Sequence, residues 1–372
     1  MKKLINNFTY ITFLGYIAFI PSGPYPISVF GIKLDILLGL VLLVLILPKI
    51  TQIGKNYPSI FLISLLFYLV TTLLSVIFSE DIVFSTSKWF SMLGYILVSI
   101  LAPIAIDNYS KIKFSRLFLL VVAVVISFFI IHMALSYGLD KPQRFYLGFD
   151  PTAPANYQSD SGVEDIVDPN MTAIGLTLSV IVYLPNFFDS HHTKRRKTLE
   201  ILAFAIITFG AFLTLSRTAI LSFSLSLVLA FTMLSISSKS IQNILTQISK
   251  LFCLLLLVMI FLFGIYTLSP SFINGFFARI ENIESGKEDR TDLISDTLSI
   301  FFSDNKNILF GQGYHITNPH NEFLRNLTSS GIFSLIAFLF FLYTLYFCIL
   351  KKIKGNYWRY FSALSIYIYI YS

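Results

Sequence analysis

The chain has 372 residues, of which 55% are hydrophobic and 16% aromatic, while only 13% are charged. Soluble domains carry roughly 25% charged residues, so this composition excludes a water-soluble globule and indicates a protein whose partner is the lipid bilayer. A net charge of +7 would suggest nucleic acid in a soluble protein. In a membrane protein the placement of charge between loops matters more, and no nucleic-acid partner is expected.

Apolar stretches long enough to cross a bilayer recur along the chain. A hydrocarbon core of about 30 Å requires roughly 20 mostly apolar residues in a helix. Lys2 and Lys3 precede the first stretch, and no small-residue cleavage site follows it, so it is expected to be an uncleaved anchor. We predict an all-α, polytopic membrane bundle of about ten to eleven helices. The expected spans are 4–22, 32–49, 58–78, 88–106, 114–137, 170–187, 199–215, 218–236, 250–268, 329–350 and an apparently truncated 357–372.

Basic residues favour one orientation of these spans. With the N-terminus in the cytoplasm, cytoplasmic loops hold 17 of the 27 basic residues but only three of the 20 acids, namely Asp107, Asp189 and Glu200. This is the distribution that the positive-inside rule requires. The two longest loops, 138–169 and 269–328, then lie on the outer face of a single membrane domain, 1–372. Long loops commonly carry function, so candidate sites are sought in them.

Arg217 is the first candidate residue. It lies in the segment Leu-Ser-Arg-Thr-Ala at 215–219, between two expected spans with almost no loop to separate them. A guanidinium at this depth is costly unless it is paired or solvated, and its planar donors suit a diphosphate or a carboxylate. An arginine that reaches the lipid headgroups would produce the same pattern.

Arg290 is the second candidate. It lies in the charged run 288–292, which opens a stretch to Phe302. The apolar positions 293, 294, 298, 301 and 302 of this stretch predict a short helix along the membrane interface, with its apolar face in the membrane. Arg290 could contact a phosphate there. A solvated charged turn, with Glu288 or Asp292 as the partner of Arg290, remains the simpler alternative.

His320 is the third candidate, in the segment Asn-Pro-His-Asn-Glu-Phe-Leu at 318–324. Asn318 and Pro319 are favoured residues at a helix start, which would place His320 in the first turn. The positive end of the helix dipole favours a neutral ring, and a neutral histidine can accept the proton of a hydroxyl. Glu322 could be the base instead, and lone histidines in outer loops are often inert.

Other polar features predict no further chemistry. No cluster of carboxylates and histidines indicates a metal site, and no cofactor is expected. The Gly-Gln-Gly segment at 311–313 is a turn without the lysine and strand context of a phosphate-binding loop. His132 is expected to be buried in helix packing, and Asp168-Pro169 is expected to start the next span.

Taken in order, these segments resemble the O-antigen ligase and O-antigen polymerase superfamily of bacterial inner membranes. The resemblance rests on the segment at 215–219, Arg290 in the large outer loop, the Gly-Gln-Gly at 311–313, and the Pro-His-Asn-Glu-Phe-Leu at 319–324 running into Gly331. It covers roughly residues 30–350. The chain departs from the family in apparently lacking its final helix or helices and in the ordinary size of its large outer loop.

The resemblance implies a GT-C-like, inverting, metal-independent glycosyltransferase with its site on the periplasmic face. The donor would be a glycan on undecaprenyl diphosphate. Arg217 and Arg290 would bind the diphosphate, His320 would orient or deprotonate the acceptor hydroxyl, and Asn321 and Glu322 would contact substrate.

Three activities stay open. A polymerase that extends a surface polysaccharide, O-antigen or capsule, is favoured because biosynthetic clusters of this kind diversify their polymerases. A ligase that transfers the chain to lipid A core or another acceptor, in lipopolysaccharide biosynthesis, is the first alternative. A flippase for a lipid-linked glycan is an alternative of another class, which the nearly uncharged mid-span regions disfavour.

Overall fold

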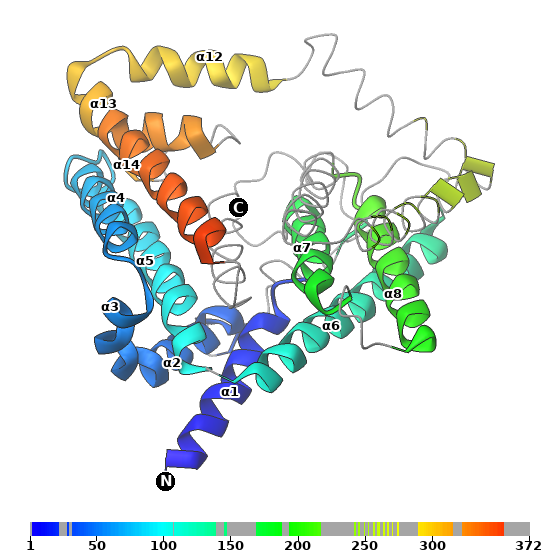
Figure 1. Cartoon of the computed structure of the whole chain (residues 1–372). Helices are drawn as coiled ribbons and strands as arrows, with labels where there is room; N and C mark the ends of the chain where they lie inside the picture. The colour runs from blue at the N-terminus through cyan, green and yellow to red at the C-terminus, as the bar shows by residue number, and fades with distance from the viewer. Residues whose placement is uncertain are drawn as a thin grey trace. The chain divides into compact units, whose positions relative to one another are not determined.

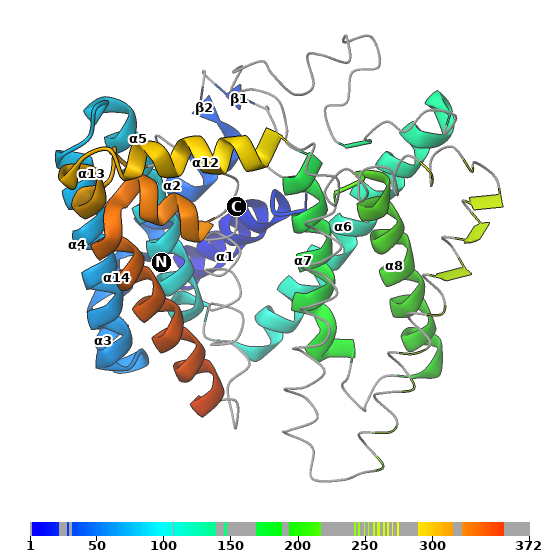
Figure 2. The same cartoon turned by 90° about the horizontal axis from the view of Figure 1, so that it is seen from above.

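The computed structural model describes residues 2–21, 28–29, 32–106, 108–138, 145–146, 169–187, 193–216, 289–314 and 322–352, with isolated helical positions between 242 and 274. Within these ranges the regular structure is helical apart from one short antiparallel pair, β1 (Ser28–Val29) with β2 (Ile32–Lys33) (Figure 2). The prediction of a helical protein is therefore confirmed, with that pair as an exception.

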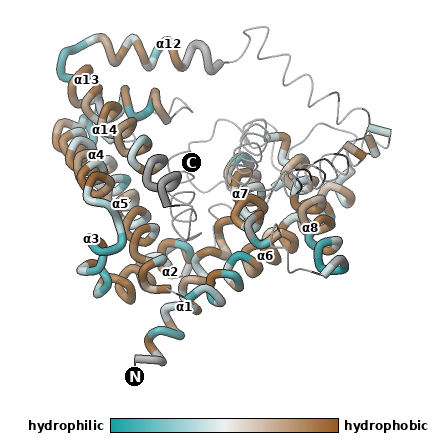
Figure 3. The backbone as a smooth tube through the Cα atoms, in the orientation of Figure 1, coloured by the Kyte–Doolittle hydropathy of each residue, from teal (hydrophilic) through white to brown (hydrophobic). Residues whose placement is uncertain are grey.

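Five of the described helices are long and apolar enough to cross a membrane. They are Leu34–Asn56, Ser59–Ile77, Ile82–Ala105, Tyr109–Tyr137 and Phe323–Leu345. Hydrophobic residues run along most of their length, whereas hydrophilic residues collect in α3 (Ile53–Asn56) and at the start of α8 (Lys194–Leu213) (Figure 3). These helices indicate a multi-pass membrane protein. The total of about ten spans stays a prediction, and the expected span 357–372 lies outside the described residues.

The chain divides into two compact units. Unit 1 comprises Met1–Thr9, Gly39–Asp107 and Asn282–Ser372, and unit 2 comprises Tyr10–Leu38 and Asn108–Glu281. Two N-terminal helices, α1 (Lys2–Ala18) and α2 (Leu34–Ile46), each contribute residues to both units. The expectation of a single membrane domain stays a prediction.

Unit 1 is built on the long helices α4 (Ser59–Ile77), α5 (Ile82–Ala105) and α14 (Glu322–Lys352) (Figure 1). The connection from α2 to α4 is formed by a 3-10 turn, Leu47–Gln52, and α3. Two shorter helices, α12 (Asp289–Phe301) and α13 (Asn305–Phe310), precede α14 and contact it. Asp81 begins α5 as a side-chain cap, because its carboxylate accepts a hydrogen bond of 2.9 Å from the backbone N–H of Phe84.

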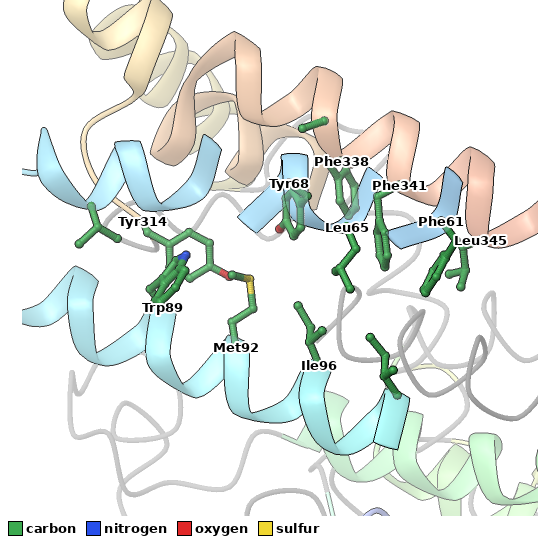
Figure 4. Close-up of a cluster of buried hydrophobic side chains, with 13 residues drawn as sticks. Phe61, Leu65, Tyr68, Trp89, Met92, Ile96, Tyr314, Phe338, Phe341 and Leu345 are labelled. Atoms are coloured by element: carbon green, nitrogen blue, oxygen red, sulfur yellow. The ribbon is translucent and has the colours of Figure 1, made fainter. Parts of the chain in front are cut away.

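The core of unit 1 lies between α4, α5 and α14 and includes an aromatic interface between α4 and α14 (Figure 4). The ring of Phe341 lies 5.7 Å from that of Phe61 and 6.0 Å from that of Tyr68. Within a bilayer, lipid tails are as apolar as these side chains, so close packing rather than escape from water holds the helices together. Large rings in contact supply that packing.

Unit 2 contains a bundle of α6 (Tyr109–Tyr137), α7 (Pro169–Phe187) and α8. The helix α7 begins at Pro169, as the sequence predicts. Helices α6 and α8 approach closely, because a Cβ at Gly210 would lie only 2.7 Å from the Cβ of Ser127. Small residues at such a crossing are typical of helix pairs in membranes. The prediction for His132 in α6 is wrong, since its side chain is exposed.

Polar side chains join the three helices of this bundle at one end. Arg116 donates to Asn186 across 3.2 Å, and Tyr183 donates to Glu200 across 2.6 Å. Arg196 forms an ion pair of 3.1 Å with Glu200. The starts of α6 and α8 therefore meet the end of α7, so successive helices of this bundle run antiparallel. Arg116 and Glu200, which the sequence assigns to cytoplasmic loops, are only 3% and 5% exposed.

Candidate functional site

The chain reaches Arg217 through a buried turn at the end of α8. Leu215 and Ser216 follow the helix, are each 1% exposed, and are the last residues described before Arg217, which itself lies outside the described residues. The Ser216 hydroxyl hydrogen-bonds the side chain of Asn170, at the start of α7, across 2.8 Å. Phe145 also packs here, since its N–H donates to the carbonyl of Leu213 across 3.1 Å. The short link that the sequence predicts is thus anchored to two neighbouring segments.

Leu215 has a backbone conformation that leucine rarely adopts. Its φ is 51°, and no other described non-glycine residue has a positive φ. This left-handed conformation costs a non-glycine residue roughly 1–2 kcal/mol. Strain of this kind persists only where the surroundings hold it, and it clusters at functional sites. The held turn gives the chain a defined direction where it enters the Arg217 segment.

The helix predicted around Arg290 exists as α12, but its packing differs from the prediction. Arg290 is its second residue, and nothing is described of the arginine side chain. Ile294 and Phe302 are exposed, as an interfacial helix requires. Phe301, predicted to face the membrane, is instead buried within unit 1, because α12 lies against α13 and α14. The exposed apolar surface of α12 is therefore narrower than the sequence suggests.

The helix that begins at Glu322 is broken. Gly331, within α14, has φ 81° and ψ 174°, which separates a half-helix, residues 322–330, from the remainder, 332–352. The remainder is long enough to cross a bilayer by itself. The half-helix folds back on it, since the ring of Phe323 lies 5.7 Å from that of Phe338. The sequence predicts an ordinary helix start before a span, and the break was missed.

The Gly-Gln-Gly segment explains how this break is stabilised. The N–H groups of Gln312 and Gly313 donate to the carbonyls of Thr328 and Ser329 across 3.2 and 3.0 Å. These carbonyls belong to the last turn of the half-helix, where no intrahelical donor follows. A side chain at Gly311 would collide with the backbone of Ser329, so only glycine permits this approach.

Two residues of α4 and its following loop complete this junction. The hydroxyl of Ser75 donates to the carbonyl of Ser329 across 2.7 Å, and the N–H of Glu80 donates to the carbonyl of Gln312 across 3.1 Å. A Cβ at Gly331 would collide with the carbonyl oxygen of Leu309. Broken helices are tolerated at membrane depth where other groups pair with the freed backbone, and this junction supplies them.

Buried hydroxyl groups lie beneath the half-helix, in a part of the chain for which the sequence predicted no site. Tyr68, in the middle of α4, donates to the amide oxygen of Asn326 across 3.0 Å, and both side chains are buried. Tyr314 donates to the sulfur of Met92 across 2.9 Å (Figure 4). A tyrosine amid an apolar span is the one sequence signal that could have drawn attention to Tyr68.

Tyr314 is kept neutral by its surroundings. Burial raises the pKa of its hydroxyl to about 12, although the nearby charge of Arg325 and a hydrogen bond with Tyr68 oppose the rise. The folded state therefore favours the protonated phenol. The resulting contribution to stability is fully present below pH 10, the ordinary pKa, and is lost as the pH rises through about 12. Tyr314 does not act as a base near neutral pH.

The candidate residues fall in both units. Position 290 and position 322 belong to unit 1, where α12 contacts α14. Position 217 belongs to unit 2. His320 and Asn321 lie outside the described residues, and Glu322 is described only as the first residue of its helix.

Among the residues that the structure describes, no group of three or more His, Cys, Asp or Glu side chains could hold a metal ion. No protein-family model matches the chain, and no curated protein matches its sequence.

Proposed function

We propose that the protein is a GT-C-like membrane glycosyltransferase that transfers a glycan from undecaprenyl diphosphate to an acceptor hydroxyl during the synthesis of a surface polysaccharide. The acceptor oxygen attacks the anomeric carbon with inversion, the bond from that carbon to the diphosphate oxygen breaks, and undecaprenyl diphosphate leaves. The proton of the hydroxyl passes to His320, or to Glu322. The site lies on the periplasmic face of a bacterial inner membrane.

The junction between residues 311–313 and the half-helix is the observation that carries the proposal. The resemblance depends on a Gly-Gln-Gly, a Pro-His-Asn-Glu-Phe-Leu and a Gly-Ile in a fixed order. In the structure, the Gly-Gln-Gly segment contacts the end of the half-helix just before this Gly-Ile, through the bonds to Thr328 and Ser329. The spacing of these segments therefore has a physical reason, because their contact holds in place the helix that begins two residues after His320.

The arginines supply the charge that the leaving group needs. A lipid-linked diphosphate sits at the depth of the headgroups, so the cations that bind it are expected at the rim of a span. Arg217 follows the last turn of α8, and Arg290 stands in the first turn of α12. Two guanidinium groups can neutralise the developing charge without a metal ion. Asn321 and Glu322 directly follow His320 in the sequence, and we expect them to contact substrate.

A polymerase and a ligase differ in what accumulates when the protein is lost. We favour the polymerase, which joins one lipid-linked repeat to another. Deletion of the gene should then leave surface glycan of single repeats, measured by electrophoresis of the extracted polysaccharide. Full-length chains retained on the carrier lipid would instead identify a ligase that uses lipid A core or another acceptor.

Substitution of His320 tests the catalytic assignment. His320→Ala should lower glycan transfer about 100-fold or more, because a general base contributes 10²–10⁴ to the rate. His132→Ala is the matched control, since His132 is an exposed histidine of α6. Both variants should insert into the membrane at the wild-type level. Normal surface glycan in the His320→Ala strain, at matched protein abundance, would remove His320 from the mechanism.

A flippase for the lipid-linked glycan is the second candidate, and the break at Gly331 favours it. Transporters often bind substrate at discontinuous helices. Reconstituted vesicles distinguish the two functions, because a flippase moves the lipid-linked glycan across the bilayer without forming a new glycosidic bond. Transfer to an acceptor on one side, without movement, supports the transferase.

A further inference from the structure

We infer that Tyr68 is a positioning residue for the transfer reaction, because its hydrogen bond to Asn326 fixes the rotation of the half-helix that begins at Glu322. This inference rests on the proposed function. Tyr68 does not touch substrate in this account. It acts through the first turn of the half-helix, which begins at Glu322, one of the two proposed proton acceptors.

The Tyr68 side chain is buried and packs against two aromatic rings of α14. Its ring stacks on that of Phe341, with centroids 6.0 Å apart, and lies 5.7 Å from that of Phe338. The side chain is only 4% exposed, and that of Asn326 is 5% exposed. A packed ring cannot swing away, so the 3.0 Å bond to Asn326 has a fixed donor position.

The bond acts at a different point from the backbone junction. The donors of Gln312, Gly313 and Ser75 bind Thr328 and Ser329, at the C-terminal end of the half-helix. If these were the only contacts of the half-helix, its N-terminal end could still turn or tilt. Asn326 lies about one turn after Glu322, where the half-helix begins. The bond from Tyr68 therefore sets the direction of the first turn.

The surroundings make this orientation strongly preferred. Rotating the half-helix would break the hydrogen bond between the buried amide of Asn326 and the hydroxyl of Tyr68, which would keep only its bond with Tyr314. The loss of a bond between buried groups is costly there, because no water replaces it. A transfer reaction depends on such precision, since a displacement of about 1 Å in a reacting group can cost roughly 100-fold in rate.

A second buried bond between the same helices provides a matched control. The hydroxyls of Ser64 and Thr344 are hydrogen-bonded, and they also join α4 to α14. Both side chains are buried. Thr344, however, belongs to the part of α14 after Gly331, so this bond does not hold the half-helix. If Tyr68 only stabilises the fold, loss of the Tyr68–Asn326 bond and loss of the Ser64–Thr344 bond should change the rate of transfer equally.

The experiment compares transfer kinetics of the full-length protein in nanodiscs. The donor is the lipid-linked glycan extracted from the deletion strain. Tyr68→Phe should lower kcat roughly tenfold to 100-fold, with the KM for the donor changed less than about twofold. Ser64→Ala should leave both parameters within about twofold of wild type, although the two variants should lose thermal stability to a similar extent.

Variants of Asn326 test the same bond from its other side. Asn326→Asp keeps an oxygen that accepts from Tyr68 and should retain most of kcat, whereas Asn326→Leu should lose it. This pair decides the question if Tyr68→Phe fails to fold. Equal kinetics for Tyr68→Phe and Ser64→Ala, a change confined to KM, or equal loss in both Asn326 variants would overturn the inference. Absence of transfer by the wild-type protein would overturn the proposed function and this role together.

Discussion

Polar groups join helices within each unit, and the two units use different chemistry for it. In unit 1, the junction of α4, α13 and α14 is made from neutral groups, mainly backbone N–H and carbonyl groups of residues 311–313 and 328–329. In unit 2, the joined ends of α6, α7 and α8 use ionisable side chains, with Glu200 between Tyr183 and Arg196. Both arrangements satisfy buried polar atoms, but they place different demands on the sequence.

Neutral backbone pairing requires glycine, whereas ionic pairing requires particular charges. Gly311 and Gly331 adopt positive φ and leave no room for a side chain. Neutral bonds avoid the cost of taking a charge out of water, so they are suited to membrane depth. Arg196 keeps its side chain 42% exposed, as expected of a charge near the interface. The comparison predicts that unit 1 is sensitive to added volume and unit 2 to altered charge.

The largest expected effect is that of Gly331→Ala. The new methyl group would meet the carbonyl of Leu309, and alanine disfavours a φ of 81°. Stability should fall by more than about 3 kcal/mol, because the backbone bonds of the junction must break to relieve the clash. Thermal unfolding of the purified protein would measure the loss.

Gly94→Ala is the control for that substitution. Gly94 lies within α5, and nothing is within 4 Å of its would-be Cβ. Alanine is the better helix former, so stability should be unchanged or rise by up to about 1 kcal/mol. Comparable losses in both glycine variants would contradict the role of the junction.

An intermediate effect is expected from Glu200→Leu in unit 2. This change leaves the buried hydroxyl of Tyr183 without its acceptor and should cost about 1–3 kcal/mol. The loss of the ion pair adds little, because the guanidinium of Arg196 can still be solvated. Glu200→Gln retains an acceptor oxygen and should cost less. If the Gln variant were as unstable as the Leu variant, charge rather than hydrogen bonding would hold this end, which unfolding at two salt concentrations would reveal.

The smallest effect is expected from Ser75→Ala. The Ser329 carbonyl would lose one donor but keep the N–H of Gly313, so no buried acceptor is left unpaired. The loss should be roughly 0.5–1 kcal/mol, detectable as a small shift in thermal unfolding. A loss as large as that of Gly331→Ala would show that the hydroxyl, and not the backbone pairing, carries the junction.

Local sequence patterns determined where the described helices lie. The expected span 58–78 corresponds to Ser59–Ile77, and 170–187 to Pro169–Phe187. The helix after Glu288 was also predicted correctly in its extent, as Asp289–Phe301. Hydropathy and capping signals act over a few turns, so they can be evaluated without knowing any distant neighbour. Arg217, Arg290 and His320 were chosen from the same local patterns and from a resemblance, and their roles stay predictions.

Only the tertiary structure shows that α14 is divided into two parts and what its first part contacts. The sequence predicted a turn at 311–313 and a helix that starts at Asn318 and Pro319, but not that the turn and the helix pair, nor that Gly331 divides the helix. Likewise Tyr68 reads as one more residue of an apolar span until Asn326, far along the chain, lies against it. The reason is physical: which donor meets which acceptor depends on the register and approach of helices, and no local pattern encodes that geometry.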